Sequence, residues 1–201
     1  MGKHRAPEGA ATDFDAATTA LTDVTGDYTV DVAHTRIGLR ARHAMVTTVR
    51  GAFTEFSGTA HLDTADPAAS TVTLRIATAS VDTGTPDRDA HLRSPDFLDV
   101  ENYPEMVFVS TEVEQIDDEV YRVTGDLTIK DVTQPVSVDF TLTGSALDPF
   151  GNTRVGFEGA VAIKRSDWAL TWNTVLDTGG VLVSDRIQVE FDVSAIRSAA
   201  A

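Results

Sequence analysis

The sequence predicts an all-β domain of eight long antiparallel strands, on three observations. Polar and apolar residues alternate along most of the chain from Tyr28 onwards, which is the period of a strand with one buried face. Turn-forming residues such as Asp117-Asp118-Glu119 separate most of these stretches. The stretches are also long, since ten residues of strand span about 33 Å. Such strands form either a sandwich or a closed barrel, and an eight-stranded barrel has room for one small ligand.

The individual strands follow from which side chains share a face. In the first, Ile37 and Leu39 point one way while Arg36 and Arg40 point the other. The later strands repeat this alternation, so each presents one apolar face to the interior. The predicted strands are 36–42, 50–63, 71–80, 106–116, 120–130, 136–144, 154–163 and 183–193.

One stretch within the domain breaks the alternation. Residues 85–99 have Pro86 near a helix start and Pro95 close to the end. This pattern predicts a short helical insertion of one or two turns near one end of the barrel.

The chain termini lie outside the strand pattern. Residues 1–25 are rich in Ala, Thr and Asp and are too polar to bury much surface, so we expect a flexible acidic tail. A short helix over 13–21, capped by Asp13, is an alternative within it. The expected division is a tail over 1–25, the barrel over 26–195 and a C-terminal tail over 196–201.

Composition excludes several classes of function. The formal charge of −15 over 201 residues argues against nucleic acid and against anionic membrane surfaces as partners. The absence of cysteine excludes disulfides, thiolate metal sites and cysteine nucleophiles. The apolar runs are far shorter than the roughly 18 residues of a membrane-spanning helix, and the start has no apolar signal region. We therefore expect a cytoplasmic protein.

The five histidines are the first candidates for chemistry, because GxSxG, HExxH and phosphate-binding glycine loops are missing. No two histidines have a close metal-ligand spacing, and His34 and His43 are nine residues apart. An odd spacing puts them on opposite faces of a continuous strand. A metal site made of His34, His43 and His91 would need a bend in the chain, so we expect no metal and no cofactor.

A second group of candidates lies in the predicted helical insertion. Arg88, Asp89 and His91 fall close together there, near a barrel mouth. An arginine at such a place binds a phosphate or carbonyl headgroup, whereas the simpler interpretation is a structural Arg–Asp ion pair. The sequence RSDW at 165–168 is interpreted as a strand end with a packed tryptophan.

Several motifs occur in a fixed order along the chain. The longest is RDAHLRSPDFLDVENYPEMVFVST at 88–111. The others are DVAHTRI at 31–37 followed by His43, GAF at 51–53, FSG at 56–58, Tyr121 with GDLTIK at 125–130, TQPV at 133–136 and RSDW at 165–168. Together they resemble the YceI-like family over about residues 26–194.

The resemblance implies an elongated, lipocalin-like antiparallel barrel that holds a polyisoprenoid, an isoprenoid quinone or a long-chain fatty-acid derivative. The function expected from it is non-catalytic binding, sequestration or transport of one such lipid. An enzyme that uses a histidine as proton shuttle in the same cavity is one alternative, and a dimeric scaffold with a filled core is another. No nucleic-acid or integral-membrane partner is expected, and a homodimer stays open.

Two sets of side chains are assigned to this ligand. Polar groups at the barrel mouth would orient its headgroup, and they are His34, His43, Arg88, Asp89 and His91. Inward-facing apolar side chains would enclose its tail, and they are Ile37, Leu39, Phe56, Leu74, Ile76, Phe108, Leu127, Ile129, Phe140, Leu142, Phe157, Val161, Trp168 and Phe191.

The sequence also departs from the family pattern at two glycine positions. Asp131 follows the lysine of the central hairpin, where relatives usually have glycine, and Ala169 follows the aromatic residue of the RSDW motif. Aspartate tolerates a left-handed turn, so we expect the hairpin to persist. Relatives commonly have glycine at position 169, which lets another part of the backbone pass close to Trp168. The side chain of Ala169 calls this close approach into question.

Overall fold

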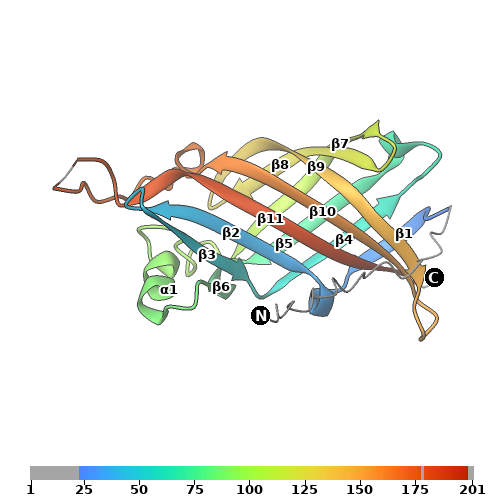
Figure 1. Cartoon of the computed structure of the whole chain (residues 1–201), viewed down its shortest axis with the longest axis horizontal. Helices are drawn as coiled ribbons and strands as arrows, with labels where there is room; N and C mark the ends of the chain where they lie inside the picture. The colour runs from blue at the N-terminus through green and yellow to red at the C-terminus, as the bar shows by residue number, and fades with distance from the viewer. Residues whose placement is uncertain (1–22, 178, 199–201) are drawn as a thin grey trace, which may run out of the picture.

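The computed structural model describes residues 23–177 and 179–198, and the helix considered over 13–21 lies outside them. Within these residues the chain forms an elongated barrel with one short α-helix at one end (Figure 1). The strands are β1 (Gly26–Val30), β2 (Arg36–His43), β3 (Thr47–Phe53), β4 (Phe56–Leu62), β5 (Thr71–Ala77), β6 (Val81–Asp82), β7 (Glu105–Asp117), β8 (Val120–Ile129), β9 (Val132–Leu147), β10 (Thr153–Lys164) and β11 (Val183–Arg197). The α-helix is α1 (Pro86–Arg93), and short 3-10 turns are η1 (Val32–His34), η2 (Pro67–Ala69), η3 (Thr78–Ser80) and η4 (Arg165–Trp168).

Strand β1 closes the sheet because it is paired on both sides. It pairs with β4 along one edge and with β11 along the other, where Tyr28 lies opposite Arg197. The closed ring therefore runs β1, β4, β5, β7, β8, β9, β10 and β11, and each neighbouring pair is antiparallel. Strands β2, β3 and β6 continue the sheet from β11. The predicted eight-stranded antiparallel barrel with one short helix is confirmed.

Two long strands of the barrel are interrupted. Strands β1 and β2 pair with successive parts of β11, with η1 between them, and Thr54 and Glu55 separate β3 from β4. The prediction of one continuous strand over 50–63 is wrong at this point. The amide of Thr54 donates to the Ser80 carbonyl at 3.2 Å, and the Glu55 carbonyl accepts from the Ala77 amide at 3.0 Å. These bonds divide the strand, so that β3 pairs with β6 while β4 pairs with β5.

The chain packs onto the barrel from Val24, two residues before the predicted domain boundary. Val24 is buried with Tyr28, Val155 and Ala195 in a small cluster inside the barrel. Its carbonyl accepts a hydrogen bond of 2.8 Å from the Tyr28 hydroxyl. At the other terminus β11 extends to Arg197, beyond the predicted end at 195. Val24 therefore packs within the barrel, and residues 196–197 belong to its last strand.

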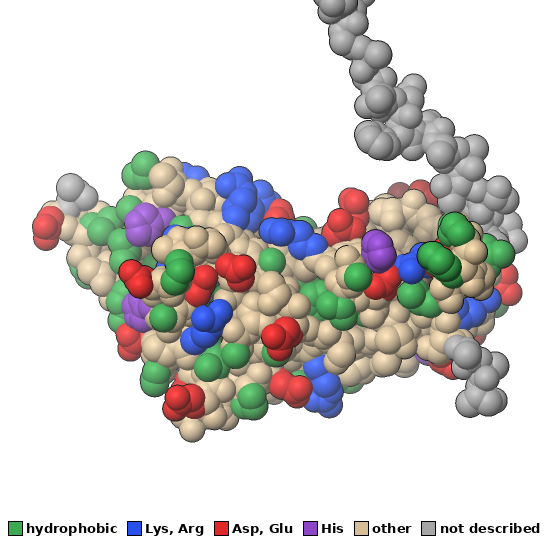
Figure 2. Space-filling view, turned by 90° about the horizontal axis from the view of Figure 1, so that it is seen from below, with side chains coloured by type: hydrophobic (Ala, Val, Ile, Leu, Met, Phe, Trp, Pro, Cys, Tyr) green, Lys and Arg blue, Asp and Glu red, His purple; other side chains and the backbone are tan. Residues whose placement is uncertain are grey.

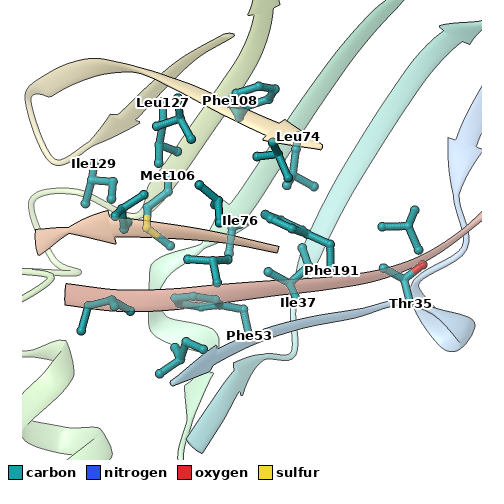
Figure 3. A pocket seen from close by; sticks show the side chains of 18 of the residues that line it. Thr35, Ile37, Phe53, Leu74, Ile76, Met106, Phe108, Leu127, Ile129 and Phe191 are labelled. Carbon is teal, nitrogen blue, oxygen red and sulfur yellow. The ribbon is translucent and has the colours of Figure 1, made fainter. Parts of the chain in front are cut away.

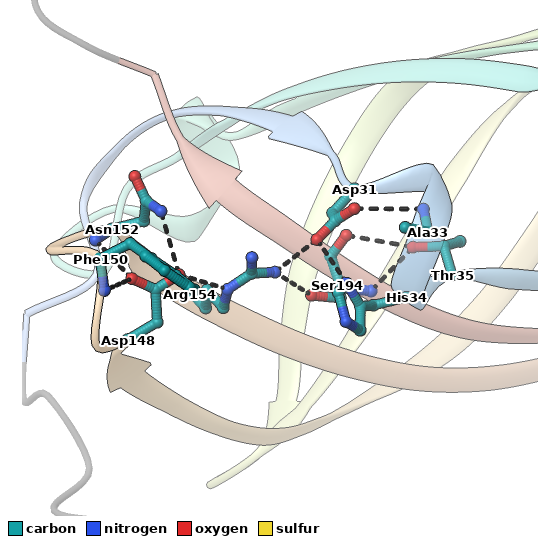
Figure 4. A network of polar contacts seen from close by, with 9 residues as sticks. All are labelled: Asp31, Ala33, His34, Thr35, Asp148, Phe150, Asn152, Arg154 and Ser194. Carbon is teal, nitrogen blue, oxygen red and sulfur yellow. Dashed lines mark hydrogen bonds and ion pairs between the residues drawn. The ribbon is translucent and has the colours of Figure 1, made fainter.

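A polar network at the end of the barrel opposite α1 joins two turns (Figure 4). Asp148, in the β9–β10 turn, accepts from the amides of Phe150 and Asn152 at 2.9 Å and from Arg154 Nε at 2.8 Å. Arg154 also forms an ion pair of 2.5 Å with Asp31, which caps η1. The arginine thus ties the β9–β10 turn to the break between β1 and β2.

The outer surface is polar and acidic. On the face drawn in Figure 2, acidic side chains are spread along the barrel rather than gathered in one patch. Among the described residues, no helix is both long and apolar enough to cross a bilayer.

We expect the Asp148–Arg154 network to make stability depend on acid pH. Hydrogen bonds from Asn152 and Arg154 hold the pKa of Asp148 well below its usual value. A lowered native pKa means that the unfolded chain takes up the proton first, so this contribution is complete above about pH 4 and declines below it. Thermal melts should show wild type more stable than Asp148→Asn at pH 7, with the difference narrowing towards pH 3. The exposed Asp131→Asn is the control, and a pH-independent difference for Asp148→Asn would contradict the assignment.

A pair of truncations tests where the folded domain begins. A chain starting at Asp23 should melt at the same temperature as the full chain, because residues 1–22 lack an apolar pattern that could dock. A chain starting at Gly26 should melt about 5 °C lower. Burying a valine contributes roughly 1.5–3 kcal/mol, and each kcal/mol moves the melting temperature of a domain this size by about 3 °C. Equal melting temperatures for the two truncations would show that Val24 adds nothing.

Candidate functional site

The interior of the barrel contains a cavity of about 740 Å³ (Figure 3). Side chains at the α1 end, such as Arg88 and His91, line one part of it, and Asp63 and Ser70 beside the β4–β5 turn line another. Between these ends the wall is almost wholly apolar. Its volume lies in the range of cavities that hold a cofactor or a small ligand. The barrel therefore encloses an elongated apolar space and not a filled core.

The wall is made by alternate residues of nearly every strand. All but two of the predicted cavity residues lie in this wall. The residues confirmed as lining it are Ile37, Leu39, Leu74, Ile76, Phe108, Leu127, Ile129, Phe140, Leu142, Phe157, Val161 and Phe191. Figure 3 shows Leu74 and Ile76 on one strand facing Phe191 and Ile37 across the interior. The period-two pattern thus corresponds to the two sides of the barrel wall.

Phe56 and Trp168 are the two predicted cavity residues that lie outside the wall. Phe56 packs against the core but Phe53 takes the place in the cavity, because the chain breaks between β3 and β4. Trp168 is buried in η4, where its Nε1 donates to the Leu127 carbonyl at 3.0 Å. Trp172 lines the cavity instead. Both predictions are corrected by local turns that interrupt strand alternation.

Two inward-facing glycines allow phenylalanine rings to lie across neighbouring strands. A Cβ on Gly125 would come within 2.5 Å of the Phe108 ring, and one on Gly159 within 2.7 Å of the Phe140 ring. Real Cβ atoms do not approach other carbons this closely, so each ring occupies the space that a side chain would take. Both phenylalanines line the cavity, so the two glycines shape its wall.

At the α1 end, Arg88 and Asp89 each bind Thr83 instead of forming the expected ion pair. Arg88 Nε donates to the Thr83 hydroxyl at 2.6 Å, and Asp89 accepts from the Thr83 amide at 2.9 Å. Burial by itself would raise the pKa of Asp89, but bonds from Thr83 and the charges of Arg93 and Arg88 lower it overall. Arg88 lines the cavity, whereas the buried Asp89 does not. Asp89 therefore holds the β6–α1 turn through Thr83 and does not face the cavity.

His91 belongs to an aromatic cluster beside the cavity. Its ring meets Phe97 and Trp172 edge-on, with centroids 5.0 and 4.5 Å away. Its Nε2 forms a hydrogen bond of 2.9 Å with Asp96. His91, Phe97 and Trp172 all line the cavity. The cluster joins α1 to the loop between η4 and β11.

His34 and His43 do not come together. His43 ends β2 and lines the cavity, whereas His34 precedes β2, is 66% exposed and bonds to Asp31 at 2.7 Å. His34 therefore lies in the polar network of Figure 4 and not at the mouth beside α1. Nowhere in 23–177 and 179–198 do three His, Cys, Asp or Glu side chains form a group that could hold a metal.

Sequence reasoning missed Arg165 as a cavity residue. Arg165 is only 6% exposed and lines the cavity, with its guanidinium 6.0 Å from the centre of the Phe97 ring. Its Nε donates to the Ser184 carbonyl at 3.1 Å and its Nη1 donates to the Leu170 carbonyl. Burial lowers its pKa, while the charge of Asp185 acts in the opposite sense. Val161, Ile163 and Arg165 are spaced two residues apart, and the first two point into the barrel. The alternation of β10 therefore predicts that Arg165 points inward as well.

Comparison with known proteins agrees with this architecture. The model of a family described as a YceI-like domain matches residues 28–195, most of the described barrel. The chain belongs to the YceI-like family. The protein YceI of Escherichia coli O157:H7 is 42% identical over 147 residues, which are 72% of this chain and 76% of that protein.

Solved structures resemble this YceI-like barrel along most of its length. BcnA of Burkholderia cenocepacia has a TM-score of 0.73 at 28% identity, covering 82% of this chain and 98% of that one. A polyisoprenoid binding domain from Saccharophagus degradans has a TM-score of 0.65 at 16% identity, covering 85% and 98%. At 16% identity, the similarity to the polyisoprenoid binding domain shows a shared fold alone.

In this YceI-like barrel both substituted glycine positions keep tight turns. The β8–β9 hairpin persists, but the positive φ, 56°, falls on Lys130 and not on Asp131. Ala169 adopts φ 58°, the left-handed conformation that glycine favours, where it ends η4. This conformation costs a non-glycine residue about 1 kcal/mol. The backbone beside Trp168 thus keeps its path despite the alanine.

We expect Asp89→Ala to destabilise the YceI-like barrel without removing its cavity. The substitution leaves the half-buried Thr83 amide without its acceptor, and such an unsatisfied donor costs about 1 kcal/mol. Urea unfolding monitored by tryptophan fluorescence measures this loss. Asp87→Ala, exposed on the same helix, is the matched control. Equal stability of both variants would show that the Asp89–Thr83 bonds do not hold the turn.

Proposed function

We propose that this protein binds one long-chain amphiphilic lipid in the barrel cavity and sequesters or transports it without chemical change. The ligand class is a polyisoprenoid, an isoprenoid quinone or a fatty-acid derivative. The observation that carries the proposal is the cavity of about 740 Å³ with an apolar wall along the barrel. Burying each methylene group contributes roughly 0.8 kcal/mol, so a long apolar tail provides ample driving force.

The distribution of polar groups supports an amphiphile over a plain hydrocarbon. Side chains with hydrogen-bond donors line the cavity at the α1 end, namely His43, Arg88, His91 and Arg165. At the opposite end the described lining has Asp63 and neutral hydroxyls such as Thr64 and Ser70, so the two polar ends of the cavity differ in charge. This difference would orient an amphiphile with its headgroup at one end and its tail along the apolar wall. Membership of the YceI-like family and the fold shared with a polyisoprenoid binding domain support the same ligand class.

A tryptophan introduced into the wall tests the proposal. Ile76→Trp should fill part of the cavity, block the lipid tail and still fold, because the added atoms enter open space. In a packed core the same change would cost about 1–3 kcal/mol by overpacking. Phe140→Trp on β9 is a second wall variant. Val109→Trp, on the outer side of β7 and 46% exposed, is the matched control.

The measurement is urea unfolding of delipidated protein with and without a long-chain quinone or polyprenyl lipid. At a hundred times its dissociation constant, the lipid should stabilise wild type and Val109→Trp by about 2.7 kcal/mol. The wall variants should gain nothing. If no lipid of either kind stabilises wild type, and both wall variants are badly destabilised without ligand, the carrier function is refuted.

A second candidate function is an enzyme acting on a hydrophobic substrate in the same cavity. It is favoured by one observation, the hydrogen bond between the cavity-lining His91 and Asp96. Such a pair resembles a general base held by a carboxylate. Incubation with each lipid, followed by extraction and mass spectrometry, distinguishes the two functions. An unchanged mass supports carriage, and a changed mass that His91→Ala abolishes supports the enzyme.

A further inference from the structure

The charge of the cavity lining at the α1 end is opposite to that of the whole protein. The chain carries a net charge of −15. Yet the ionisable side chains that line the cavity at this end are basic apart from Asp87, and they are Arg42, His43, Arg88, His91 and Arg165. On the face drawn in Figure 2, acidic side chains are spread along the outside of the barrel. The lining at this end therefore favours negative charge.

These basic groups are linked through Arg165. The Ser184 carbonyl accepts from Arg165, and the Ser184 hydroxyl accepts from the Arg42 amide at 2.9 Å. On the other side, the Arg165 guanidinium lies over the Phe97 ring. The centroid of that ring is 5.0 Å from the centroid of the His91 ring. Arg165 thus lies between the end of β2 and helix α1.

Arg165 is a buried cation without a carboxylate partner. Among the described residues, no carboxylate oxygen comes within 4.0 Å of its guanidinium nitrogens, the limit for an ion pair. The nearby Asp185 instead accepts from the Ser166 amide at 3.0 Å and from its hydroxyl at 2.8 Å. Arg154, by contrast, has both Asp31 and Asp148 as partners. Arginine does not deprotonate in proteins, so a buried one needs a counter-charge.

We propose that the ligand has an anionic headgroup, a carboxylate or a phosphate, bound by Arg165 at the α1 end of the cavity. Nε and Nη1 are used by the Ser184 and Leu170 carbonyls, and Nη2 has no hydrogen-bond partner in the part of the chain that the structure describes. An anion bound there accepts a charge-assisted hydrogen bond and supplies the missing counter-charge. Arg88 and His91 line the same end and add donors. This inference rests on the proposed lipid-binding function and narrows its ligand class.

The experiment compares three ligands that share one tail. Geranylgeraniol, geranylgeranyl phosphate and geranylgeranoic acid differ only in the headgroup, and their dissociation constants are measured by fluorescence titration of delipidated protein. A charge-assisted bond corresponds to about tenfold or more in affinity. We therefore expect the phosphate, the acid or both to bind wild type at least about tenfold more tightly than the alcohol. Comparison of the two anions shows which headgroup the site prefers.

Variants of Arg165 assign the effect to this residue. Arg165→Gln should lower the ratio of alcohol to anion dissociation constants by about tenfold, the share of one charge-assisted hydrogen bond, and Arg165→Lys should retain most of the ratio. Arg186→Gln, which removes an exposed charge on β11 outside the cavity wall, is the control and should leave the ratio unchanged. A merely structural arginine would weaken alcohol and anion alike, so the ratio separates the two roles. Melting temperatures verify that each variant is folded.

The outcomes distinguish this inference from the function on which it rests. If the alcohol binds wild type as tightly as both anions, the anionic headgroup is refuted while lipid binding stands. If Arg165→Gln keeps the wild-type ratio, Arg165 is not the anchor. If none of the three ligands binds, lipid binding fails for this tail, and the headgroup proposal fails with it. Should Arg165→Gln not fold, the wild-type comparison of the alcohol with the two anions still decides whether the headgroup is anionic.

Discussion

The cavity depends on the pairing of β1 with β11. This pairing is short, from Tyr28 opposite Arg197 to Val30 opposite Ala195, yet it joins the two ends of the ring. An open sheet of the same strands would leave its apolar face exposed to water and would need a second layer to cover it. Closure instead turns that face inward on all sides. The apolar side chains then cover one another across a space too wide to be filled.

Closure also explains why the interruptions in the strands lie where they do. The break at η1 lets the chain pair with β11 twice, first through β1 and then through β2. The break at Thr54 and Glu55 divides the facing strand at the corresponding place. Arg154 binds Asp31 beside the first break, so an ion pair of low exposure holds the point where the closing strand changes direction. Regular pairing is thus interrupted at two neighbouring points, between β1 and β2 and between β3 and β4.

The polarity of the interior matters as much as its size. An apolar wall retains any long hydrocarbon, so it contributes affinity without selecting a ligand. The α1 end differs from this wall, because the helix, the η4 turn and the end of β2 contribute basic side chains to the lining there. Helix α1 has an additional structural role there, because Arg88 and Asp89 hold the Thr83 turn and Arg93 donates to the Ala79 and Val81 carbonyls. The same short element holds the β6–α1 turn and contributes Arg88 and His91 to the cavity lining.

Local sequence patterns were sufficient to predict most of the strands and most of the cavity wall. Period-two alternation reports which side chains are buried, and in a closed barrel the buried face is the cavity wall, so residues such as Leu74 and Phe140 were predictable. Alternation does not report backbone pairing. It therefore continued through Thr54 and Glu55, and it misplaced Phe56 and Trp168 beside local turns.

The positions of the polar candidates depend on contacts between distant parts of the chain. His34 and His43 are near in sequence, but β2 separates them because an extended strand rises about 3.3 Å per residue. The bulge between Ser110 and Glu112 lets Phe108 and Val113 line the same cavity despite their odd spacing. Arg165 shares the inward parity of β10, yet its lack of a carboxylate partner depends on residues that come from other elements of the fold. Partners distant in the chain are set by barrel closure, which no local pattern encodes.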